Sequence, residues 1–413
     1  MIIIIIIMED NYIPEEKKKY FVNDRVLNAI NKKFVSLPNY EKKATNEYLH
    51  QVIDGILEKM KEGAFFKKVF KRILFVGSYY KGTKIGVPEE FDINIIIKLP
   101  INYEFVEIEL CEHPGFIKIY SGLKQNELTC DVKTDRVLKS LLDQDMYIDQ
   151  KKFRGWMEGI LSNTIQKLPL IKNKYLFNIQ NTIYMIRITK SGPAFTFEVE
   201  LPNGKTINVD LVPVLEFSKS VPFINYNLVF KKQNWLAVPK CFQTNFKIRH
   251  SCWRACFYEQ EKEILSKNGQ IKPIIRLMKK LRDTENWKNI ASYYIETIAL
   301  RQLLYNKNFG NISYTLSFME MLTYMHTTLI NKYLPYYWNK ELNLLCNLNP
   351  EEITNISNRL GRIINKIYTS IKDDPYIIAF YILNPEEYKE LVSELNKEPL
   401  ETKDDEKNLC MIL

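Results

Sequence analysis

The chain has 413 residues, of which 46% are hydrophobic and 26% charged, with only 14 glycines. Such a chain buries a sizeable core, so a disordered or low-complexity protein is excluded, and it is too long for one small domain. The net charge of +9 favours polyanionic partners such as nucleotides or nucleic acid, although lysine-rich helices are often only solvated surfaces.

The first 19 residues are predicted to form an N-terminal extension. Its six consecutive isoleucines are far fewer than the roughly 20 apolar residues that span a bilayer. It also lacks the basic region and cleavage site of a secretory signal. The seven cysteines show no disulfide-framework spacing. We therefore expect a reducing, cytoplasmic environment.

Apolar residues recur at helical spacing between residues 24 and 61, with an interruption at Pro38. The second half of this pattern predicts a long amphipathic helix that ends near Gly63. The region contains many lysines, and they indicate either a surface for nucleic acid or an ordinary polar face.

Two short motifs follow this helix. Gly77 and Ser78 end an apolar run, as at a strand-to-helix turn, where backbone N–H groups bind phosphate oxygens. After eleven intervening residues, Glu90 and Asp92 lie two apart in an isoleucine-rich strand, so both carboxylates project from one face. Each motif alone is commonly structural, but together they indicate metal-assisted phosphoryl transfer.

A third carboxylate lies in a later strand. The Asn203-Gly204 hairpin signal precedes the apolar run TINVDLVP, in which Asp210 is the only charged residue. A carboxylate among apolar neighbours is costly unless it is neutralised or metal-bound. Asp210 is therefore either a buried, hydrogen-bonded aspartate or a metal ligand. Beyond Pro239 the pattern becomes dominated by helical periodicity.

The order of strand, Gly-Ser, E-x-D and apolar strand resembles the nucleotidyltransferase superfamily. The sequence segments GTKI and EFD, followed by LP, are similar to those of the cyclic GMP–AMP synthase and cyclic GMP–AMP synthase-like receptor family. The resemblance implies a bilobed α+β nucleotidyltransferase fold. Residues 20–240 would form the mixed-sheet catalytic core with a spine helix, 241–395 a helical C-terminal lobe, and 396–413 a flexible tail.

In this family the acidic triad, here Glu90, Asp92 and Asp210, holds two Mg²⁺ or Mn²⁺ ions about 3.5–4 Å apart. Asp210 would also activate the attacking hydroxyl. The implied substrates are ATP and GTP, and the implied product is a cyclic dinucleotide made in two successive transfers. Such a product, similar to cyclic GMP–AMP, serves antiviral innate immunity.

The resemblance also implies nucleotide contacts from Gly77, Ser78, Arg254, Lys279, Ser292 and Tyr293. Trp253-Arg254 resembles a family motif whose arginine contacts a base. Lys279 and Ser292 correspond to phosphate contacts, and Tyr293 to a residue that stacks on a base. Cys256 and Tyr258 stand where the family often has serine, so base selectivity remains open.

The segment SKNGQIKPIIRLMKK contains none of the cysteines or histidines of the zinc-binding insertion of vertebrate members. His250, Cys252 and Cys256 offer at most three ligands, whereas structural zinc needs four, so no structural zinc is expected. This favours the zinc-less invertebrate-type receptors and double-stranded RNA as the activating ligand, with other nucleic acid as the alternative.

The chain ends in Cys410-Met-Ile-Leu, which fits the C-a-a-X prenylation motif and predicts a geranylgeranyl group on Cys410. Partial membrane association would follow. Two other functions remain open: a transferase with a different acceptor, such as an oligoadenylate-forming enzyme, and a catalytically silent scaffold. The phosphodiester linkage, the bases chosen and the oligomeric state are not fixed by the sequence.

Overall fold

The structure is a computed structural model, and it describes residues 13–36, 39–123, 131–224, 230–231, 233–240, 250–306, 309 and 311–397. Most of the expected N-terminal extension, nearly all of the tail and Cys410 lie outside the described residues. Contacts divide the chain into two compact units. The sheet unit contains residues 37–272 and 333–347, and the helical unit contains the described residues up to Ser36, from 273 to 332 and from 348 onward.

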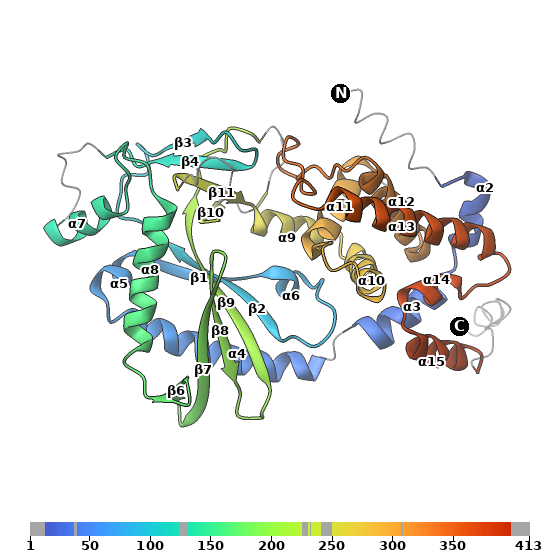
Figure 1. Cartoon of the computed structure of the whole chain (residues 1–413), viewed down its shortest axis with the longest axis horizontal. Coiled ribbons are helices and arrows are strands. Elements are labelled where there is room, and N and C mark those ends of the chain that lie inside the picture. The colour runs from blue at the N-terminus through green and yellow to red at the C-terminus, as the bar shows by residue number, and fades with distance from the viewer. Residues whose placement is uncertain are drawn as a thin grey trace, which may run out of the picture. The chain divides into compact units, whose positions relative to one another are not determined.

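An α+β fold is confirmed, because the sheet unit combines helices with a large mixed sheet (Figure 1). Its elements are α4 (Asn39–Met60), α5 (Ala64–Val69), β1 (Phe70–Val76), α6 (Gly77–Lys81), β2 (Glu90–Ile97), β3 (Glu107–Leu110), β4 (Phe116–Tyr120), α7 (Val132–Ser140), α8 (Gln150–Ile165), β5 (Leu170–Ile171), β6 (Lys174–Ile179), β7 (Thr182–Ser191), β8 (Ala194–Glu200), β9 (Thr206–Phe217), β10 (Trp235–Val238), β11 (Cys252–Cys256) and α9 (Tyr258–Lys267).

The described part of the helical unit combines long helices, α10 to α13, with shorter ones. Its elements are α2 (Glu15–Lys18), the 3₁₀ turn η1 (Lys19–Phe21), α3 (Arg25–Ile30), the π-helical turn η2 (Asn31–Val35), α10 (Ile271–Thr284), α11 (Ser292–Tyr305), α12 (Tyr314–Ile330), α13 (Pro350–Ser370), α14 (Ile377–Ile382) and α15 (Pro385–Leu395). Within the described part of the chain, no helix has the length and apolar character needed to cross a membrane.

Strand β9 is the centre of the sheet. One edge of β9 pairs in parallel with β2 from Asn208 to Leu215. The opposite edge pairs antiparallel with β8 over its first half and with β10 over its last three residues. β1 extends the sheet beyond β2, while β11, β4 and β3 extend it beyond β10. β9 therefore joins the two ends of the sheet.

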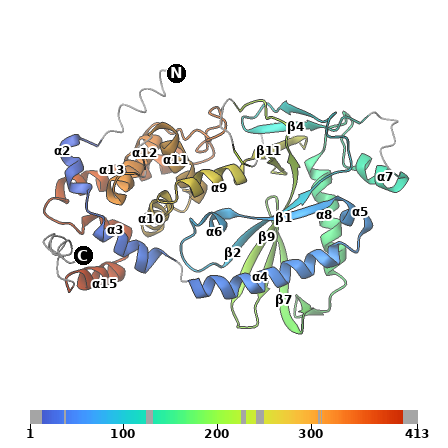
Figure 2. The same cartoon turned by 180° about the vertical axis from the view of Figure 1, so that it is seen from behind.

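The predicted spine helix is present as α4, which runs along the sheet beside β7 in the view of Figure 2. Leu49, Val52, Ile53 and Ile56 are all at most 1% exposed, so the predicted apolar stripe is the buried face. Gly55 allows the close approach, because a Cβ there would lie 2.9 Å from Ile179 Cδ1.

The N-terminal segment belongs to the helical unit rather than to the sheet unit. Ser313 Oγ donates to Phe21 O at 2.5 Å, and Thr315 N donates to Asp24 Oδ1 at 2.9 Å. Arg25 Nη2 donates to Leu395 O at 2.7 Å. The sequence analysis grouped residues 20–36 with the catalytic core, because chain proximity does not reveal these bonds between residues about 300 positions apart.

A buried ion pair connects β9 to β1. The Glu216 side chain is 4% exposed, and it accepts hydrogen bonds from Lys71 and from Arg72, the latter at 2.7 Å. Burial opposes ionisation of Glu216, but the two basic partners outweigh it and lower the pKa of the carboxyl.

Glu216→Gln should therefore lower the free energy of unfolding at pH 7 by about 1–3 kcal/mol. Because the folded-state pKa is depressed, this contribution is present above the ordinary glutamate value of about 4.5 and is lost as pH falls through the folded-state pKa. Urea unfolding at pH 7 and pH 3 measures both, with the exposed Glu89→Gln as control. An equal deficit at the two pH values would contradict this assignment.

Candidate active site

Two of the three predicted carboxylates lie on adjacent strands. Asp92 on β2 is directly opposite Asp210 on β9 in the parallel ladder, and Glu90 is opposite Asn208. Neighbouring strands are about 4.8 Å apart, and directly opposed residues project from the same face. The register therefore places Asp92 and Asp210 side by side, with Glu90 two residues earlier on the same face.

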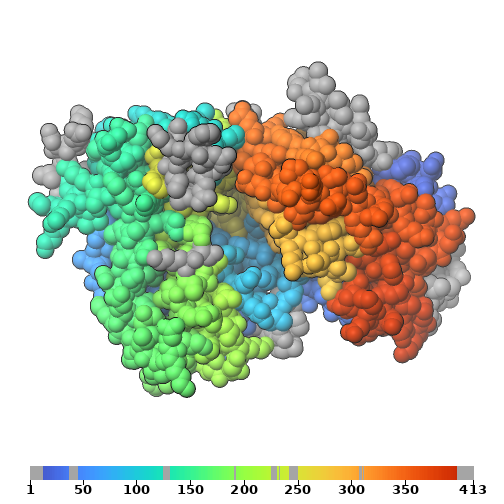
Figure 3. Space-filling view, viewed as in Figure 1, coloured from blue at the N-terminus to red at the C-terminus, as the bar shows by residue number. Residues whose placement is uncertain are grey.

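The local sequence explains why these carboxylates are accessible. Along β2 the exposed Glu90 and Asp92 alternate with the buried Phe91, which is 1% exposed, and the apolar residues from Ile93 onward are buried. In the space-filling view of Figure 3, the light-blue segment that includes β2 reaches the surface beside the green strands β7 to β9. The predicted alternation is thus present, and it keeps the acidic end of β2 open to a substrate.

Thr196 on β8 is a site residue that the sequence analysis missed. It is the ladder partner of Asp210, and its Oγ1 donates to Asp210 Oδ1 at 2.5 Å. This bond fixes the orientation of the carboxylate. The available signal was the alternation in AFTFEVE, where Thr196 lies between two buried phenylalanines and so shares a face with the acids.

Gly77 lies directly against Asp92, one member of the acidic pair. The predicted strand-to-helix turn is present, with β1 ending at Val76 and α6 beginning at Gly77. Gly77 has a φ of +77°, and a Cβ at this position would lie 2.0 Å from Asp92 Oδ2. Glycine is therefore required both by the left-handed backbone and by the carboxylate.

Glu90 is turned toward a different partner. Its side chain is 74% exposed, and its Oε2 lies 3.2 Å from Lys84 Nζ. Among the residues that the structure describes, no three His, Cys, Asp or Glu side chains gather closely enough to hold a metal ion.

The donor set nevertheless fits a hard divalent cation. All three carboxylates project from one sheet face, and Asp92 and Asp210 are directly opposed on adjacent strands. Oxygen ligands are those that Mg²⁺ and Mn²⁺ prefer. Glu90 can reach the other two by rotation about its side-chain bonds, because its backbone already lies on the correct face.

Arg254 lies on β11, toward the other end of the same sheet face. Its guanidinium stacks over the Tyr336 ring at 4.1 Å, and its Nη1 donates to Gly115 O at 3.4 Å. The ladders place β11 two strands from β9, with Arg254 in the row four residues beyond Asp210. Strand spacing and rise then separate the two Cα atoms by roughly 16 Å.

The other three predicted contacts belong to the helical unit. Lys279 on α10 is 1% exposed and forms an ion pair with Glu296 on α11 at 2.9 Å. Ser292 is the first residue of α11, and its Oγ accepts from Arg282 Nη1 at 2.9 Å. Tyr293 follows it, and its carbonyl accepts from Thr297 Oγ1 at 2.8 Å. Their roles toward a nucleotide stay predictions.

Two of the cysteines form a disulfide that the sequence spacing did not indicate. Cys111 and Cys252 are bonded with their Cα atoms 6.1 Å apart, although 141 positions separate them in the chain. Such a bond is uncommon in the reducing environment that the sequence analysis expected. Burial raises the pKa of the Cys256 thiol to about 11, so this group is protonated at neutral pH.

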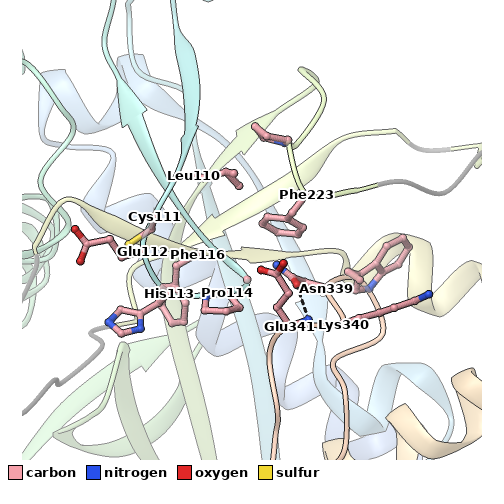
Figure 4. Close-up of a pocket in the computed structure, with 13 residues that line it drawn as sticks. Leu110, Cys111, Glu112, His113, Pro114, Phe116, Phe223, Asn339, Lys340 and Glu341 are labelled. Carbon is pink, nitrogen blue, oxygen red and sulfur yellow. Dashed lines mark hydrogen bonds between the residues drawn. The ribbon is translucent and has the colours of Figure 1, made fainter. Parts of the chain in front are cut away.

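A cavity of about 520 Å³ lies between the β3–β4 turn and the loop that contains Trp338 (Figure 4). Gly115, whose carbonyl accepts from Arg254, is one of the residues that line it. Phe116, Phe223 and Trp338 supply aromatic walls, and Asn339 Oδ1 accepts from Glu341 N at 2.9 Å. All residues that line the cavity belong to the sheet unit.

An E-x-D strand paired with a third aspartate, with a Gly-Ser turn against it, is the arrangement that the resemblance to nucleotidyltransferases implied. Residues 79–267 match the family model of the Mab-21 protein nucleotidyltransferase domain, and residues 270–362 match that of the Mab-21 protein HhH/H2TH-like domain. The first match contains the acidic triad and Arg254, and it begins directly after Ser78.

Curated relatives agree with this class. The chain is 36% identical to a cyclic GMP-AMP synthase-like receptor of Trichogramma pretiosum, over 91% of this chain and 79% of the relative. It is 38% identical to one of Microplitis demolitor, over 94% and 73%, and 32% identical to one of Aethina tumida, over 95% and 99%. The chain belongs to the cyclic GMP–AMP synthase-like receptor family.

Gly77→Ala should abolish nucleotide turnover, because its methyl group would displace the Asp92 carboxylate. Gly86→Ala is the matched control, since Gly86 has a φ of +71° but no atom within 4 Å of the added Cβ. Both variants introduce an alanine in left-handed backbone and should lose about 1–2 kcal/mol of stability. Thermal melting and nucleotide consumption separate the effects, and equal activity of the two variants would contradict the contact.

Proposed function

We propose that the protein synthesises a cyclic dinucleotide second messenger from ATP and GTP in innate immune defence, and that nucleic acid activates it. The observation that supports this most strongly is the in-register pairing of Asp92 with Asp210, which both lie within the matched nucleotidyltransferase segment, with Gly77 beside Asp92. Family membership supports the choice of product.

Glu90, Asp92 and Asp210 would hold Mg²⁺ or Mn²⁺ at the acidic end of β2 and β9. Bound divalent ions neutralise the charge that develops on the attacking and leaving oxygens of phosphoryl transfer. Thr196 holds Oδ1 of Asp210, so it fixes the carboxylate that would orient the attacking hydroxyl. Lys84 competes for Glu90, so Glu90 would exchange this partner when it joins the other two acids.

The nucleotides would extend from the acids toward β11. Backbone N–H groups of Gly77 and Ser78 would contact phosphate oxygens. The separation of roughly 16 Å between the backbones of Asp210 and Arg254 suits a nucleoside triphosphate with its phosphates at one end and its base against the arginine. In the helical unit, Ser292 and Tyr293 would supply polar and stacking contacts. Lys279 has the weakest support, because it is buried against Glu296.

Double-stranded RNA is the proposed activator. Its A-form helix is read by shape and backbone, which suits an exposed basic surface. Lys67 on α5 is exposed and can contribute, whereas Lys68 forms an ion pair with Asp131 and Lys71 forms one with Glu216. Binding to such a surface should weaken steeply with salt, because condensed counterions are released.

Two alternative functions predict different outcomes. An oligoadenylate-type transferase would form linear chains from ATP alone, and a silent scaffold would consume no nucleotide. The deciding experiment incubates the purified protein with four labelled nucleoside triphosphates and Mg²⁺ or Mn²⁺, with no ligand, double-stranded RNA or double-stranded DNA. A cyclic product only with RNA supports the proposal. Linear products, no consumption or full activity without nucleic acid would each overturn part of it.

Asp92→Asn and Asp210→Asn should each abolish product formation and leave RNA binding within about twofold, because a metal ligand is lost while the basic surface is unchanged. Glu89→Gln is the matched control, since it removes one neighbouring exposed carboxylate and should keep full activity. Substantial product from the Asp92→Asn protein would refute the site.

We also propose that Cys410 carries a geranylgeranyl group in animal cells. The tail near it is acidic overall and lacks the second basic signal that makes anchoring stable, so membrane attachment should be partial. Intact-mass measurement and fractionation of the native protein beside Cys410→Ser test this. An unmodified C-terminus with identical fractionation would refute it.

A further inference from the structure

Three segments of the sheet unit meet at one buried carboxylate. Glu261 on α9 forms an ion pair with Lys81 at 2.8 Å, and both side chains are only 4% exposed. Its other oxygen, Oε1, accepts from Trp338 Nε1 at 3.0 Å, and Trp338 is 2% exposed. The Lys81 ammonium also lies 5.1 Å from the centre of the Tyr258 ring. We call Lys81, Glu261 and Trp338 the buried clamp.

Each segment of the buried clamp carries part of the candidate active site. Lys81 is the last residue of α6, whose first residue, Gly77, contacts Asp92. Glu261 is in the first turn of α9, directly after the strand that carries Arg254. Trp338 lies two residues after Tyr336, on which the Arg254 guanidinium stacks. The clamp therefore connects the phosphate end of the site to the base end.

Stability alone does not account for this arrangement. Burying two charges costs several kcal/mol each, and a buried pair is often no more stabilising than apolar residues of the same volume. A hydrogen-bonded ion pair also restricts the two helices to one geometry. Its hydrogen bonds are broken when either helix shifts by about an ångström or more.

We propose that Lys81, Glu261 and Trp338 are positioning residues that fix α6 relative to β11, and so hold the Gly77 turn against Asp92 and the Tyr336 loop against Arg254. This inference rests on the proposed function for its effect on catalysis. The clamp touches none of the reacting atoms. Its loss should weaken nucleotide binding and slow turnover even where the fold is intact.

The test compares Lys81→Met, Glu261→Gln, the double variant Lys81→Met/Glu261→Gln, Trp338→Phe and the conservative Lys81→Arg. Each single change at Lys81 or Glu261 leaves a buried charge unpaired and should lower the melting temperature, so neither decides the question. The double variant removes both charges and should melt close to the wild type. Glu216→Gln is the control, because it loses a buried carboxylate whose ion-pair partners both lie on β1.

We expect kcat/KM for ATP and GTP to fall at least tenfold in the double variant, mainly through KM, and about threefold in Trp338→Phe. Lys81→Arg should recover activity to within about threefold of wild type, and Glu216→Gln should lower the melting temperature with KM unchanged. Wild-type KM and kcat in a well-folded double variant would overturn the proposal.

Hydrogen exchange provides a readout that needs no catalysis. In the double variant, backbone amides of residues 77–83 should exchange faster than in the wild type, and Glu216→Gln should leave them unchanged. Faster exchange together with a wild type that consumes no nucleotide would support the clamp and refute the proposed function. Unchanged exchange in an active protein would refute the clamp and leave the proposed function standing.

Discussion

The register of the parallel pair β2 and β9 is the constraint on which the candidate site depends. The acidic ends of both strands are held by their apolar continuations, because Ile93 to Ile97 pair with Leu211 to Leu215 inside the core. A slip of one residue would move every side chain of one strand to the other face. Hydrophobic burial away from the site therefore decides that Asp92 lies beside Asp210.

The contacts around the acids divide into two kinds. Thr196 and Gly77 act directly on the carboxylates, one by a hydrogen bond and the other by leaving space that a side chain would fill. Arg254 is placed at a distance by strand spacing, and Tyr336 supports its guanidinium. Such a sheet presents negative charge at one position and positive charge at another, which is what the proposed binding of a nucleoside triphosphate requires.

Local pattern was sufficient for the elements that carry the acids. Helical spacing predicted α4, and the spacing of two in a strand predicted that Glu90 and Asp92 share one face. Local pattern did not predict contacts between residues that are distant in the sequence. Nothing in the sequence near Lys279 indicates burial against Glu296, and nothing near Cys111 indicates Cys252. These contacts form only after the chain has brought remote segments together, and local periodicity holds no information about them.

Buried ion pairs recur on the elements that present site residues. Glu261 lies in the helix that follows Arg254, and Glu296 lies one turn after the predicted contact Ser292. Apolar packing tolerates small shifts and exchanges of similar side chains, whereas a desolvated carboxylate loses several kcal/mol if its partner moves away. Each of these ion pairs therefore prevents its element from sliding along the neighbouring element, in addition to holding the two in contact. A candidate active site assembled from separate segments needs that restriction, because an error of about 1 Å in a reacting group is enough to slow catalysis about a hundredfold.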